Sequence, residues 1–180
     1  MLLANHDFMN IRRPFTVALA VVTLLLVSSS AARAQVCGAW STPLLAGQTI
    51  TAGTVTVTND TSNIYVHYSA AAPWLLGEVH VAVADSLAGI PQTKRGNPIP
   101  GRFAYSASFA PGFTEYLVVI PRVAALAAAQ QIVVATHAVV HAPENEGGTQ
   151  TGWGFGFDFP GSNWATYLVY SVNNCSQFPE

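Results

Sequence analysis

The sequence predicts an all-β protein: a single β-sandwich, immunoglobulin-like or jelly-roll-like, of about eight strands with one short helix, following a cleaved signal peptide. Several segments alternate apolar and polar residues, which is typical of half-buried strands. Turn-forming residues separate these segments at the intervals typical of a sandwich. Only 9% of the residues are charged. Valine, threonine, alanine and aromatic residues are abundant, as in β-rich proteins.

The first 34 residues have the features of an export signal. Arg12 and Arg13 supply positive charge, residues 16–27 form a short apolar stretch, and Ala32-Arg33-Ala34 is an A-x-A cleavage site. About 12 apolar residues are too few to span a ~30 Å hydrocarbon core. We therefore expect cleavage without a retained membrane anchor, and a location that is secreted, periplasmic or at the cell surface.

Two details of export stay open. Translation can begin at Met1 or at Met9, which changes only the length of the basic region. The arginine pair is also found in twin-arginine signals, but the continuation Pro14-Phe15-Thr16 fits general secretion better.

Residues 35–180 have the size of one secreted domain with a real core. Eight acids and four bases follow residue 34, and eight minus four gives a net charge of about −4. This balance argues against nucleic-acid binding, which needs clustered cations. Cys37 and Cys175 are the only cysteines. Val36 is a poor residue before a lipid-attachment cysteine, so we expect the two to form a disulfide in an oxidising compartment. Unpaired thiols or an intermolecular bridge are the alternatives.

The elements follow in order along the domain. Gly53–Thr58 alternates valine with threonine, and Ile64–Ser69 forms its hairpin partner across a turn at residues 59–63. Residues 85–102 contain three prolines and three glycines, which predicts a long irregular loop. An alanine-rich segment at 122–130 predicts the helix, and residues 143–148 an acidic loop. The remaining expected strands are 78–84, 103–109, 114–120, 132–142, 149–159 and 164–172.

Several phrases together resemble an uncharacterised family of exported bacterial domains. They include AGTVTVTND from Ala52, Glu78-Val79-His80, and GNPIPG from Gly96. ATHA from Ala135, TGW from Thr151 and NWATY from Asn163 continue the series. The resemblance covers almost the whole exported chain in order. It implies an extracellular domain and brings no established activity or catalytic residues.

Glu78, His80 and His137 form the first candidate site. Glu78 and His80 share one face of a strand, as do His137 and His141. If the two strands are neighbours, a carboxylate and imidazoles meet, which is a ligand set that zinc prefers. His137 and His141 are about 13 Å apart along a strand, so only one can join the cluster. The alternative is that each histidine is a hydrogen-bonded, half-buried residue.

The second candidate site is the run from Trp153 to Phe159, in which every second residue is aromatic. A continuous strand would place all four aromatic rings on one face and Asp158 on the other. Such rings can stack on sugars, and the carboxylate can bind hydroxyl groups. The alternative is that the rings form the inner layer of the sandwich.

We therefore expect a binding or surface-interaction module whose partner is an extracellular glycan or a surface protein. The alternatives are a small extracellular hydrolase or metal-dependent enzyme using Glu78, His80 and His137, and a purely structural or adhesive domain. No catalytic motif is present, so an enzyme is the weaker expectation. No cofactor is indicated. Zinc at the histidines, or calcium near Asp85 and Asn97, is a minor alternative.

Overall fold

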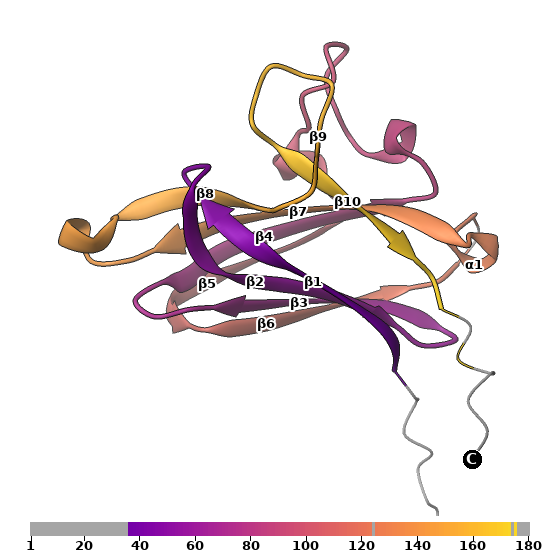
Figure 1. Ribbon diagram of the computed structural model, residues 1–180, viewed down its shortest axis with the longest axis horizontal. Helices are drawn as coiled ribbons and strands as arrows, with labels where there is room; N and C mark the ends of the chain where they lie inside the picture. Colours follow the sequence, from indigo (N-terminus) through magenta and orange to yellow (C-terminus); the bar gives the residue numbers. More distant parts are fainter. Residues whose placement is uncertain (1–35, 124, 174, 176–180) are drawn as a thin grey trace, which may run out of the picture. The chain divides into compact units, whose positions relative to one another are not determined.

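A computed structural model of the 180-residue chain describes residues 36–123, 125–173 and 175. The expected signal peptide at 1–34 lies outside these residues. The described chain forms antiparallel strands with one short α-helix and three 3-10 turns (Figure 1). The strands are β1 (Cys37–Ala46), β2 (Ile50–Asn59), β3 (Asn63–Ala70), β4 (Leu75–Ala84), β5 (Tyr105–Phe113), β6 (Glu115–Pro121), β7 (Gln131–His141), β8 (Thr149–Gly154), β9 (Phe157–Asp158) and β10 (Thr166–Ser171). The helical turns are η1 (Leu87–Gly89), η2 (Pro100–Arg102), α1 (Ala125–Ala128) and η3 (Glu144–Glu146).

The all-β prediction is confirmed, but the described strands form one connected sheet rather than two separate ones. Its order is β5-β4-β7-β8-β1-β2-β3-β6. β8 pairs with one half of β7 and β10 with the other half, and β9 pairs with β10. The sheet curls until its two ends, β5 and β6, line a common pocket. A strongly twisted sheet can therefore enclose a core by itself, which alternation alone does not distinguish from a sandwich.

The main core fills the inside of this curl. The alternating positions predicted to be buried, such as Val55, Val57, Val79 and Val81, are fully enclosed. Burial of each such side chain contributes roughly 1.5–3 kcal/mol. Tyr68, on β3, is fully buried in this core. Its hydroxyl donates to the backbone carbonyls of His80 on β4 and His137 on β7, at 3.2 and 3.3 Å. The predicted hairpin is present, because Thr54 pairs with Ser69 and Thr58 with Tyr65.

Strand β1 was not among the predicted strands. It contains Pro43 and two irregularities, one between Cys37 and Trp40 and one between Leu44 and Leu45, so it lacks regular alternation. Its first residue lies beside the chain's end: Cys37 and Cys175 form the predicted disulfide, with Cα atoms 5.6 Å apart. The disulfide therefore joins the start of β1 to the last residue that the structure describes.

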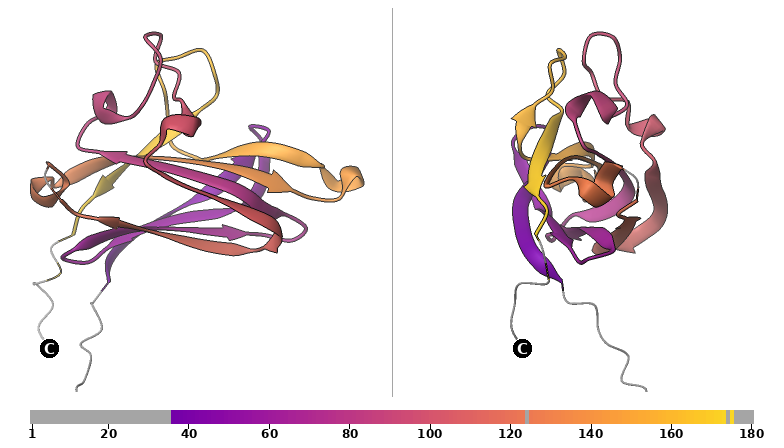
Figure 2. Two further views of the ribbon diagram at one scale, coloured as in Figure 1. Left: turned by 180° about the vertical axis from the view of Figure 1, so that it is seen from behind. Right: turned by 90° about the vertical axis from the view of Figure 1, so that its right-hand side faces the viewer.

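A small lobe rises from the outer side of the sheet, and Figure 2 shows its two loops side by side. One is the predicted irregular loop between β4 and β5, and the other joins β8 to β10. They cover a second cluster of buried residues, separate from the main core. Its members are Ala82, Ile90, Phe103, Val133, Ala135, Trp153, Phe159 and Ala165. We call this cluster, with its two loops, the outer lobe.

Candidate functional site

Five neighbouring strands place one row of side chains across the outer face of the sheet. Directly opposite residues on one face have Cβ atoms roughly 4.5–5.5 Å apart. The row therefore sets His137 between Trp153 and His80. In order across β1, β8, β7, β4 and β5, the paired residues are Leu45, Trp153, His137, His80 and Ser106.

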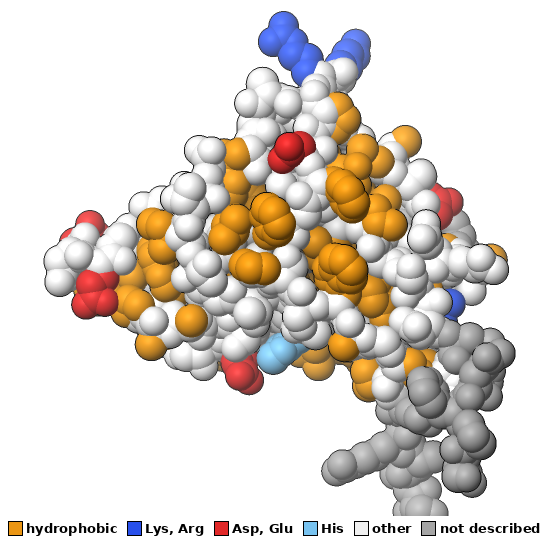
Figure 3. Space-filling model, viewed as in Figure 1, with side chains coloured by type: hydrophobic (Ala, Val, Ile, Leu, Met, Phe, Trp, Pro, Cys, Tyr) orange, Lys and Arg blue, Asp and Glu red, His pale blue; other side chains and the backbone are white. Residues whose placement is uncertain are grey.

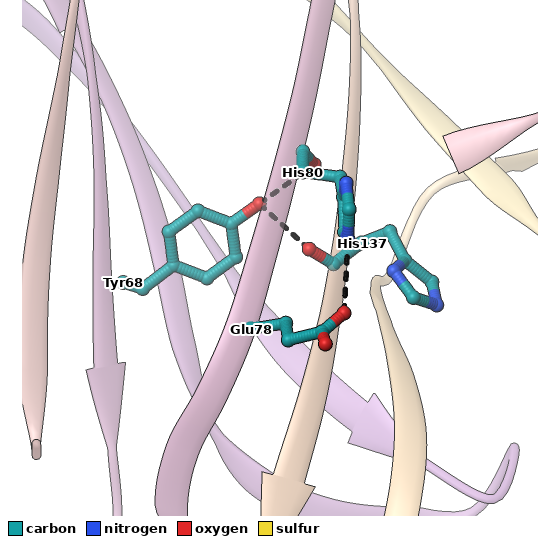
Figure 4. A network of polar contacts seen from close by, with 4 residues as sticks. All are labelled: Tyr68, Glu78, His80 and His137. Atoms are coloured by element: carbon teal, nitrogen blue, oxygen red, sulfur yellow. Dashed lines mark hydrogen bonds and ion pairs between the residues drawn. The ribbon is translucent and has the colours of Figure 1, made fainter. Parts of the chain in front are cut away.

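The predicted cluster of Glu78, His80 and His137 does come together (Figure 4). Glu78 Oε2 lies 3.3 Å from His80 Nε2, and the two imidazole centroids are 5.5 Å apart. His141 is not part of the cluster, since its Nδ1 contacts the hydroxyl of Thr149 at 2.9 Å. The carboxylate can therefore orient the ring of His80 and hold a proton on Nε2.

His137 is the most perturbed ionisable group of this cluster. Its side chain is only 9% exposed and packs edge-on against Trp153, with centroids 4.9 Å apart. Burial, with a smaller contribution from repulsion by His80, lowers the pKa of His137 to about 4. The ring is therefore neutral at physiological pH.

Within the described residues, no three His, Cys, Asp or Glu side chains are placed to hold one metal ion. The Nδ1 atoms of His80 and His137 are buried and find no hydrogen-bond partner in the same part of the chain. The cluster is therefore a polar site with two buried ring nitrogens that can accept a hydrogen bond from a ligand.

The prediction that the four aromatic residues from Trp153 to Phe159 share one face is wrong. Trp153 and Phe159 are buried, whereas Phe155 and Phe157 are 56% and 62% exposed. The strand β8 ends at Gly154, although the Phe155 N–H still donates to the carbonyl of Pro43 in β1. A Cβ at Gly156 would collide with the Tyr167 backbone, so only glycine fits where these two segments approach each other.

The break creates a shallow pocket of about 170 Å³ beside the outer lobe. It brings together the two predicted residues Trp153 and Asp158, with Trp153 buried and Asp158 exposed. The other lining residues are Leu45, Gln48, Phe155, Trp164 and Thr166. Figure 3 shows apolar side chains gathered over this face of the molecule, with an acidic side chain among them.

Gln48 is a pocket residue that the sequence reasoning missed. It lies in the turn between β1 and β2 and has a φ of 79°, a left-handed conformation that few residues other than glycine adopt. The preceding Gly47 also has a positive φ of 52°. Such a pair is typical of the tight turns that close hairpins. A turn at these residues could therefore be predicted from the sequence, but the position of Gln48 beside Phe155 could not.

Asn97 fixes the loop that carries Trp164. Its Oδ1 accepts hydrogen bonds from the N–H groups of Ser162 and Asn163, at 2.8 and 3.1 Å. Asp85 Oδ1 accepts a hydrogen bond from the Ser86 hydroxyl at 3.1 Å. The oxygens predicted as calcium donors thus bond within the protein, and Asn97 ties the two loops of the lobe together.

Comparison with known proteins adds no identification. No family model matches the chain, and no curated protein or solved structure is significantly similar to it. The resemblance to exported bacterial domains therefore stays a prediction. No described helix is long and apolar enough to cross a membrane.

Proposed function

We propose that this protein is a secreted or cell-surface binding module whose ligand is a carbohydrate, held in the pocket of Phe155, Asp158 and Trp164. One observation carries the proposal: a half-exposed aromatic ring and an exposed carboxylate line the same pocket. Exposed apolar groups rimmed by polar ones are typical of interaction sites. The disulfide between Cys37 and Cys175 is consistent with an oxidising compartment.

The chemistry of a pyranose suits these groups. Its C–H face packs against an aromatic ring, as in other contacts of apolar groups with aromatic faces. Its hydroxyls donate to the Asp158 carboxylate and exchange hydrogen bonds with the Gln48 amide. At about 170 Å³ the pocket is smaller than a drug-sized site of roughly 300–1,000 Å³. It therefore holds one sugar ring of a longer chain, and weak binding per site is expected.

Titration calorimetry after a glycan-array screen tests this directly. Phe155→Ala removes the exposed ring and should weaken binding roughly 5–30-fold, which corresponds to about 1–2 kcal/mol. Phe113→Ala is the matched control, because Phe113 is 48% exposed but lies on β5 outside the pocket. Circular dichroism must show both variants folded. Equal affinity in the two variants, or no glycan binding by the wild type, contradicts the proposal.

Gln48→Gly gives a second, independent probe of the same pocket. Glycine adopts the left-handed conformation freely, so this change removes the amide without straining the turn. We expect unchanged or slightly higher thermal stability together with weaker glycan binding. Unaltered affinity would exclude Gln48 from the ligand contacts.

The second candidate function is a small hydrolase or metal-dependent enzyme at Glu78, His80 and His137. The observation that favours it is the contact of His80 with Glu78, next to the neutral His137. Native mass spectrometry after incubation with zinc or nickel tests the metal-dependent form. Retention of one ion by the wild type, and its loss in His80→Ala, would support it. If neither a metal nor a glycan binds, a structural or adhesive domain is the remaining proposal.

A further inference from the structure

The candidate glycan pocket carries a single ionisable side chain, and its charge is negative. Of the lining residues, only Asp158 has an acidic or basic side chain. Asp158 is exposed and, among the described residues, makes no ion pair or hydrogen bond through its side chain. Both carboxylate oxygens are therefore available to a ligand.

From this charge we infer that the pocket selects sugars with a free amino group, such as unacetylated glucosamine, over neutral and acidic sugars. The inference rests on the proposed carbohydrate-binding function and names the ligand class within it. An ammonium group donates to a carboxylate through charge-assisted hydrogen bonds, which are roughly twice as strong as neutral ones. An acidic sugar would bring a second negative charge to Asp158 and lose affinity.

The charge of the whole exported domain acts in the same direction. Eight acids against four bases after residue 34 give a net charge of about −4. A negative surface raises the local concentration of cationic ligands and speeds their association. Phe155 and Trp164, at the same pocket, favour the rigid C–H face of a pyranose over the flexible chain of a lysine residue.

Four ligands separate the contributions of ring, charge and acetyl group. Cellotetraose, tetraglucosamine and tetra-N-acetylglucosamine share one β-1,4-linked backbone and differ at C2. Tetralysine with an acetylated N-terminus and an amidated C-terminus carries the same four ammonium groups without a sugar. Calorimetry at low ionic strength should show tetraglucosamine binding about three to five times more tightly than cellotetraose. This factor corresponds to the upper range for an exposed ion pair.

Asp158→Asn keeps the shape and one oxygen acceptor while removing the charge. It should abolish the preference for tetraglucosamine, so that tetraglucosamine and cellotetraose bind the variant equally tightly. Glu146→Gln, in the exposed turn η3, is the control for the same change in net charge and should keep the preference. In the wild type, raising the salt concentration to about 1 M should also reduce the preference, because exposed charges are screened.

The outcomes distinguish the two levels of proposal. Equal binding of cellotetraose and tetraglucosamine, or a preference that survives in Asp158→Asn, overturns the amino-sugar inference and leaves carbohydrate binding intact. Tetralysine binding as tight as that of tetraglucosamine overturns it in favour of a basic peptide ligand. If none of the sugars binds at millimolar concentration, carbohydrate binding itself fails.

Discussion

The main core and the outer lobe are built on opposite faces of the same strands, and they are held together differently. The main core takes its residues almost entirely from strands, and most of these are fully enclosed. The outer lobe combines residues of β4, β7 and β8 with side chains from two irregular loops, such as Ile90, Phe103 and Phe159. The regular face therefore supplies stability, and the irregular face presents aromatic and acidic groups to solvent.

The hydrogen bonds show the same contrast. Long ladders of paired residues connect the strands around the main core, as between β4 and β7. The two loops of the lobe are joined instead by the Asn97 side chain, and the short bridge from Gln92 to Pro98 lies within the loop between β4 and β5. Regions with few buried contacts and few backbone pairs open at low free-energy cost. We expect the lobe to open before the main core unfolds.

The largest expected effect concerns the disulfide, which closes the core side of the molecule. Cys37 and Cys175 are separated by 138 residues in the chain. A loop of that length corresponds to an upper value of about 5 kcal/mol in the chain-entropy model. The double variant Cys37→Ala/Cys175→Ala should lose up to this amount in urea unfolding, with the lobe still formed in the native state.

Asn59 also holds the C-terminal segment near the disulfide, through hydrogen bonds. Its Oδ1 accepts from the Tyr170 hydroxyl at 2.8 Å and from the Asn173 N–H at 3.0 Å, so it holds the C-terminal segment without the disulfide. A loss below about 1 kcal/mol in the double variant would show that this network suffices. Asn59→Ala in the double variant would then destabilise more than Asn59→Ala in the wild type.

The main core was largely predictable and the candidate site was not, for a physical reason. Alternation along β2, β3, β4 and β7 reports which side chains face inward, because a strand turns successive residues to opposite faces. The same rule failed at Phe155, because the strand ends there and the next residue, Gly156, passes close to the backbone of Tyr167. Sequence placed Trp153 and Asp158 near one another. It could not place Gln48 or Trp164 beside them, since those contacts depend on the path of two loops.

His137 lies on the outer face of the sheet, where the outer lobe meets the strands of the main core. Its protonation gives the second prediction. Unfolded His137 gains its proton near pH 6.5, but in the folded protein its pKa is about 4. Its contribution to stability is therefore full above pH 6.5 and is lost as the pH falls towards 4. For this reason the free energy of unfolding should be about 3 kcal/mol lower at pH 4 than at pH 7. Urea unfolding of the wild type at pH 7 and pH 4 measures it.

His137→Phe isolates this contribution. It keeps an aromatic ring against Trp153 and removes a nitrogen that has no partner in the described residues, so the fold should tolerate it. Although burial favours protonated Asp60, hydrogen bonds from Tyr65 and two backbone N–H groups lower its pKa, which also makes acid destabilising. That effect is common to both proteins and cancels. The variant should lose less stability than the wild type between pH 7 and 4. His67→Gln, a control on β3, should lose as much stability as the wild type.

The smallest expected effect separates the lobe from the core most directly. Asn97→Ala removes two hydrogen bonds to the loop of Trp164, each worth about 0.5–1.5 kcal/mol in net stability. Because the lobe opens locally, the loss should appear mainly as faster cleavage by trypsin at Lys94 and Arg95, which lie in the same loop. The free energy of global unfolding should fall by only about 1–2 kcal/mol. Asn97→Asp, which keeps an oxygen acceptor, should restore most of the protection.

Cleavage that rises only in proportion to global unfolding would show that the lobe and the main core unfold as one cooperative unit. The contrast between them would then be one of composition alone.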